Sequence, residues 1–197
     1  MRRLRISFAL AAVMALTLAL PVSAGIRETA PVLKYGTTME TEGSASMVRT
    51  PAGVAVNVHL KELTPGNAIT VWFVHFNECV DADACNPSDL GIPDSGNGAI
   101  WSQIGGVVGR NGQFNQGTFI AVGENTGGPA PVALSNPLGA EIHLVVQDHG
   151  PALTGADLVE QTTTFEGGCG NGMPPTSEAD GDTCVDVQVV GFLFPNG

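Results

Sequence analysis

The chain has 197 residues and a formal net charge of −11, with 43% hydrophobic and 14% charged residues. This composition excludes a disordered acidic tail, because such tails are rich in charge and poor in apolar residues. It also argues against nucleic-acid binding, since an acidic protein repels phosphate backbones and the basic residues beyond position 5 are scattered.

The first 24 residues have the pattern of a cleavable signal peptide. Three arginines lie within the first five positions, the stretch 6–20 is uncharged, and the small residues Val22 and Ala24 suit signal peptidase. An uncleaved anchor would need about 20 continuous apolar residues, and Pro21 interrupts this stretch. We therefore expect cleavage after Ala24 and no membrane span afterwards.

Cleavage would leave 197 − 24 = 173 residues, which suits one domain over residues 25–197. Three of the eight basic residues leave with the signal and all 19 acidic residues stay, so the charge becomes 5 − 19 = −14. The sequence thus predicts a secreted or periplasmic protein, whose partner would be extracellular or in the cell envelope.

The mature chain keeps four cysteines, and an even count in an exported protein indicates two disulfides. Three pairings are possible. We favour Cys79–Cys85 with Cys169–Cys184, because each pair encloses a polar segment rich in Gly, Asp and Pro. A four-thiolate metal site is disfavoured, since structural zinc sites place their cysteines in closer pairs.

Short apolar runs alternate with turn residues along the whole mature chain, which is typical of an all-β domain. The pattern predicts a Greek-key β-sandwich, immunoglobulin-like or superoxide dismutase-like, with two disulfide-closed loops. The expected strands are 46–50, 53–63, 68–76, 99–108, 113–122, 140–147, 160–165 and 185–194.

Three of these strands carry more detailed predictions. In 53–63, every second residue from Val54 to Leu60 is a large aliphatic one, so His59 on the other face should point to solvent. The run 68–76 is apolar on both faces and should be an interior strand. Asn111-Gly112 between 99–108 and 113–122 predicts a hairpin.

Motifs of catalysis are missing from the sequence: it has no G-x-S-x-G, no H-E-x-x-H and no phosphate-binding loop. We assign no catalytic residue. His75, His143, Asp148 and His149 together offer imidazole and carboxylate ligands, which suit zinc or copper. The alternative is that both strand histidines are hydrogen-bonded and that 148–151 forms a turn.

Four segments, 70–77, 105–109, 139–152 and 163–169, together resemble a family of secreted bacterial proteins of unknown function. The similarity covers most of the mature chain and implies export without implying an activity.

Leu63-Thr64-Pro65-Gly66 and His149-Gly150-Pro151-Ala152 also resemble elements of chordin-type (CHRD) domains, which share a sandwich plan with copper/zinc superoxide dismutases. The resemblance implies a Greek-key sandwich. The paired histidines of those families are halved here, because Phe73 and Gln147 stand where the first histidine of each pair would fall. Dismutase chemistry is therefore not implied.

Two classes of function follow. The first is a non-catalytic exported binding or surface-associated module that uses the long loops 77–97 and 167–183 for contact. The second is a zinc- or copper-binding protein or enzyme centred on His75, His143, Asp148 and His149.

Overall fold

A computed structural model describes residues 25–37, 40–78, 85, 99–124, 132–164, 167 and 184–193. The signal segment and most of the two long loops lie outside the described residues. Within them the chain is all-β, with eight antiparallel strands and one short helix.

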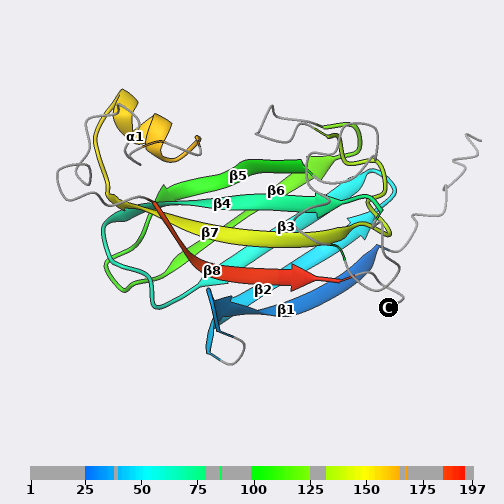
Figure 1. Ribbon diagram of the computed structural model, residues 1–197, viewed down its shortest axis with the longest axis horizontal. Helices are drawn as coiled ribbons and strands as arrows, with labels where there is room; N and C mark the ends of the chain where they lie inside the picture. Colours follow the sequence, from blue (N-terminus) through cyan, green and yellow to red (C-terminus); the bar gives the residue numbers. More distant parts are fainter. Residues whose placement is uncertain are drawn as a thin grey trace, which may run out of the picture.

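The elements follow the chain in the order of Figure 1. They are β1 (Ile26–Lys34), β2 (Thr41–Thr50), β3 (Gly53–Leu60), β4 (Asn67–Phe76), β5 (Ala99–Val107), β6 (Phe114–Ala121), β7 (Glu141–Pro151), α1 (Ala156–Gln161) and β8 (Val185–Phe192).

All eight strands form one sheet in the order β5-β4-β7-β8-β1-β2-β3-β6. The sheet curls until it is nearly closed, with β6, β3 and β2 passing behind β5, β4 and β7 (Figure 1). The core lies inside the curl, where aliphatic and aromatic side chains from all eight strands pack together. The expected alternation in β3 is confirmed, because Val54, Val56, Val58 and Leu60 are all buried.

Strand β4 is buried on both faces, as its sequence predicts. Ile69, Val71 and Phe73 point into the core. Thr70 and Trp72 point outward but are also buried, because the chain after β7 covers this face. α1 lies at one end of β4 and β5 (Figure 1). The position of β4 beside β7 matters for the candidate site, since β4 carries His75 and β7 carries the other three predicted ligands.

Two sequence predictions about pairing and helix content are wrong. Gly112 does make a tight turn, with the Gly109 N–H bonded to the Gln113 carbonyl at 3.0 Å. However, among the described strands β5 pairs only with β4 and β6 only with β3, so the strands on either side of the turn lie at opposite edges of the sheet. Of the expected strand 160–165, the described residues 160–164 are instead the end of α1 and a turn, because Ala, Leu, Glu and Gln favour a helix.

The cysteines are partly visible. Cys85 and Cys184 each take part in a disulfide, and the described residues include no free cysteine. Cys79 and Cys169 lie outside the described residues, so the pairing Cys79–Cys85 with Cys169–Cys184 stays a prediction. No helix among the described residues is long and apolar enough to cross a membrane.

Candidate functional site

The predicted ligands His75 and His143 lie on opposite faces of the sheet. His143 pairs with Val74 and shares its outward face, whereas His75 is the next residue of β4 and points into the core. The Nε2 atom of His143 lies 2.6 Å from Oε1 of the buried Glu141, and its ring packs edge-on against Phe76. His143 is therefore a hydrogen-bonded strand residue.

His75 is fully buried, and burial lowers its pKa to about 4, although a hydrogen bond with the Ala133 backbone opposes this. The cause is that the apolar core disfavours the charged imidazolium. His75 is thus neutral at physiological pH.

His149 lies in a buried polar chain on the outward face. Its Nε2 is 2.7 Å from Thr70 Oγ1, and its Nδ1 is 2.6 Å from the Gly167 carbonyl oxygen. A carbonyl only accepts, so Nδ1 carries the proton and Nε2 accepts from the Thr70 hydroxyl. Trp72 Nε1 donates to the same hydroxyl at 2.7 Å. Burial lowers the pKa of His149, which favours this neutral form.

Asp148 points to the opposite face of β7 from His149 and accepts hydrogen bonds from one side chain and one backbone N–H. Its carboxylate accepts from Asn67 Nδ2 at 2.9 Å and from the Gly150 N–H at 2.8 Å. The alternative prediction of a turn at 148–151 is wrong, because these residues continue strand β7. The hydrogen bond that it implied, from a backbone N–H to the Asp148 carboxylate, is present.

The four predicted ligands are therefore separated. His149 contacts Thr70, which lies five residues from His75 on β4, or about 16 Å at the usual rise of a strand. Across the part of the chain that the structure describes, no three His, Cys, Asp or Glu residues form a group that could hold a metal ion. Zinc or copper binding at these residues stays a prediction, and the described geometry does not bring the four side chains together around one point.

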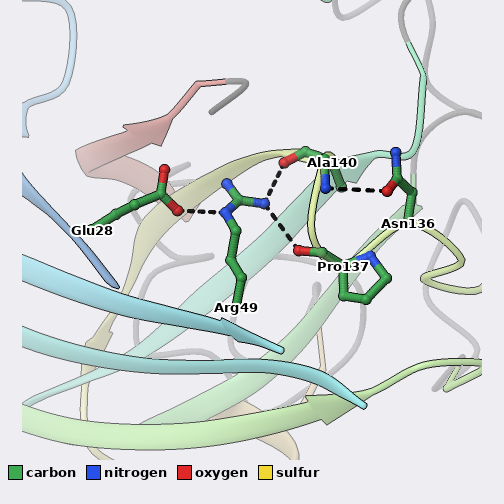
Figure 2. Close-up of polar contacts among 6 residues, drawn as sticks. Glu28, Arg49, Asn136, Pro137 and Ala140 are labelled. Carbon is green, nitrogen blue, oxygen red and sulfur yellow. Dashed lines mark hydrogen bonds and ion pairs between the residues drawn. The ribbon is translucent and has the colours of Figure 1, made fainter. Parts of the chain in front are cut away.

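A second buried polar cluster centres on Arg49 and was not predicted. Arg49 has 0% exposure and its guanidinium contacts the Glu28 carboxylate through Nε (Figure 2). Its Nη1 donates to the Ala140 carbonyl at 2.6 Å and to the Pro137 carbonyl at 3.2 Å. The guanidinium therefore ties β1 and β2 to the segment that leads into β7.

The signal for Arg49 was present in the sequence. Ala45 and Met47 precede it at alternate positions of β2, so the same alternation places Arg49 inside. The alternation within β2 does not predict the hydrogen-bond partners of Arg49, because Glu28 and Ala140 lie 21 and 91 residues away in the sequence.

The exposed candidate surface is the outward face of β2, β3 and β6, which we call the open face. It carries small, aliphatic, amide and hydroxyl side chains, one imidazole and one aromatic ring, and none of its residues is Asp, Glu, Lys or Arg. Its residues are Ser44, Ser46, Val48, Ala55, Asn57, His59, Asn115, Gly117 and Phe119.

Two glycines let side chains of the open face lie close to the backbone. A Cβ at Gly117 would come within 2.3 Å of Asn57 Oδ1, so the Asn57 amide lies over this glycine. A Cβ at Gly53 would come within 2.9 Å of the Phe119 ring, so this ring lies along the sheet while remaining 50% exposed. His59 and Asn115 contact each other across the same two strands.

No protein family, curated protein or solved structure matches the chain.

Proposed function

We propose that the chain is an exported, non-catalytic β-sandwich of Greek-key type that binds a neutral, hydroxyl-rich polymer, such as a polysaccharide, through its open face. The observation that carries the proposal is an exposed, uncharged face on a chain with a net charge of −11. The signal-like segment 1–24 supports a secreted or periplasmic location, and the resemblance to CHRD domains supports the sandwich plan.

The chemistry of the open face favours a neutral ligand. It offers no ion-pairing group to a charged ligand, and the acidity of the chain repels anions. Asn57 and Asn115 can each donate and accept hydrogen bonds, as sugar hydroxyls do. The exposed Phe119 ring supplies an apolar surface beside them. An extended polymer suits an exposed face that spans three strands better than a small molecule does, because a small molecule binds in a concave pocket.

Binding is tested with the exported protein by retention on cellulose and chitin, and by affinity electrophoresis in gels that contain neutral or anionic soluble polysaccharides. We expect retardation by a neutral polymer only. Phe119→Ala and Asn57→Ala should each weaken it at least about fivefold, in line with the loss of one contact worth about 1 kcal/mol.

Val159→Ala is the matched control, because Val159 is a 61% exposed apolar residue on α1, away from the open face. It should bind as the unchanged protein does. Failure to bind any neutral polysaccharide, or binding that both open-face variants retain in full, would overturn the proposal.

A further inference from the structure

We propose that two copies of this chain associate by antiparallel pairing of their β6 strands across a twofold axis at Gly117. The inference does not depend on the polysaccharide proposal. It follows from the position of β6 at the end of the strand order, where it pairs with β3 on one side and, among the described residues, with no strand on the other.

Three residues of β6 direct their backbone groups to this open edge. The Val122 N–H bonds to the Ala52 carbonyl beside β3, whereas the Ala121 N–H bonds to the Glu124 carboxylate. Backbone groups alternate along an antiparallel strand, so those of residues 115, 117 and 119 face away from β3. All three residues are exposed.

Gly117 shows that the edge itself is accessible. The Asn57 amide covers the outward face of Gly117, β3 pairs with one side of it, and the core lies on the other face. Its exposure therefore comes from the remaining side, the edge of the sheet. β5 approaches β6 through the Phe114 ring and Gln116 Oε1, which lie against Gly106 of β5, and Gly117 stays exposed beside them.

The sequence and register of β6 carry none of the features with which a strand protects its own edge. Its sequence FNQGTFIA has no charged residue and no proline, and its eight-residue register with β3 has no bulge. An unprotected, regular edge is a template for another strand.

The edge is self-complementary, which favours a second copy over another partner. An antiparallel register centred on Gly117 places Gly117 opposite its own symmetry mate and Asn115 opposite Phe119 of the other copy. Each of the three pairs then joins residues whose backbone groups face each other, as in a hydrogen-bonded pair.

Charge also favours contact at this edge. Two copies repel each other through their net charge of −11, and neither β6 nor the adjacent β3 contains a carboxylate. The two open faces would become one continuous surface. Because the residual repulsion is long-ranged, added salt should strengthen the dimer.

The test is sedimentation velocity of the exported protein from about 10 μM to about 1 mM, at low and at high salt. We expect a monomer–dimer equilibrium that salt shifts toward the dimer. The double variant Asn115→Lys/Phe119→Lys places lysine opposite lysine twice and should weaken the dimer about tenfold. Asn115→Glu/Phe119→Lys changes the same positions but places opposite charges together, so it should dimerise at least as well as the unchanged protein.

Ser44→Lys/Ser46→Lys controls for net charge, because it adds the same two charges to the open face on β2, away from the edge. It should not weaken the dimer. Circular dichroism of each variant checks that it is folded. The inference is overturned if the protein stays monomeric at every concentration and salt level. It is also overturned if the β6 edge binds a foreign extended peptide but not a second copy of the chain. A dimer that Asn115→Lys/Phe119→Lys and Asn115→Glu/Phe119→Lys weaken equally would also overturn it.

Discussion

Buried histidines show at the residue scale how position in the sheet decides chemistry. His75 lies at the end of the inward row that begins with Ile69, and this row is otherwise apolar. His149 lies on the outward face, where Thr70 and Gly167 satisfy both ring nitrogens. Burial lowers the pKa of both residues, so folding holds both in their neutral form.

Folding stability should therefore fall as the pH drops from about 6.5 to about 4. The unfolded chain protonates His75 near pH 6.5, whereas the folded protein protonates it near pH 4, so protons bind the unfolded chain preferentially between these values. The contribution of His75 is fully present above pH 6.5 and is lost as the pH falls through this window. The pKa difference corresponds to about 3 kcal/mol.

Urea unfolding across this pH range measures the effect. His75→Gln should flatten the profile relative to the unchanged protein, whereas Val159→Ala, at an exposed position of α1 that does not titrate, should leave the shape of the profile unchanged. Parallel profiles for the unchanged protein and His75→Gln would contradict the assignment of this pH dependence to His75.

At the scale of elements, close backbone approaches decide which segments cover the sheet. A Cβ at Gly105 of β5 would come within 1.9 Å of the Thr162 carbonyl oxygen, just after α1. This glycine allows the turn after α1 to lie directly on the sheet. The buried Gln161 holds the same turn through hydrogen bonds to the carbonyls of His149 and Pro151.

Gly105→Ala should therefore loosen the covering segment without unfolding the sheet. The added methyl group meets backbone, which cannot move aside as a flexible side chain would, and the displacement should cost about 1–3 kcal/mol. Hydrogen exchange should rise in residues 153–164 and stay low in β2 and β3. Val107→Ala, at a 42% exposed position of the same strand, should change neither. Equal protection in both variants would show that Gly105 is not needed for this contact.

For the whole molecule, the predicted disulfides Cys79–Cys85 and Cys169–Cys184 would each close one of the two long loops. Peptide mapping of the exported protein without reduction should find Gly25 at the N-terminus, with Cys79 joined to Cys85 and Cys169 joined to Cys184. The double variant Cys169→Ser/Cys184→Ser should lose about 3 kcal/mol of stability, because a loop of about 15 residues gains entropy in the unfolded chain. Any other pairing in the peptide map would contradict the prediction.

The sequence by itself determined which way most side chains face. The alternation of Val54, Val56 and Val58 and the unbroken apolar run of β4 predict burial correctly, because the pleat of a strand sends successive side chains to opposite faces. Strand β1 was missed, since its alternating pattern is weak and only Val32 is fully buried. The helix α1 was missed because the three threonines at 162–164, which are β-branched, favour a strand.

Only the tertiary structure decided which strands pair and which side chains meet. The turn at Gly112 predicts a hairpin locally, yet β6 pairs with β3 because closing the sheet around a shared core buries more apolar surface than one hairpin does. Contacts such as Thr70 with His149, 79 residues apart, depend on that arrangement. The open face and the free edge of β6 arise in the same way, because neighbours in space are set by the sheet and not by the local pattern.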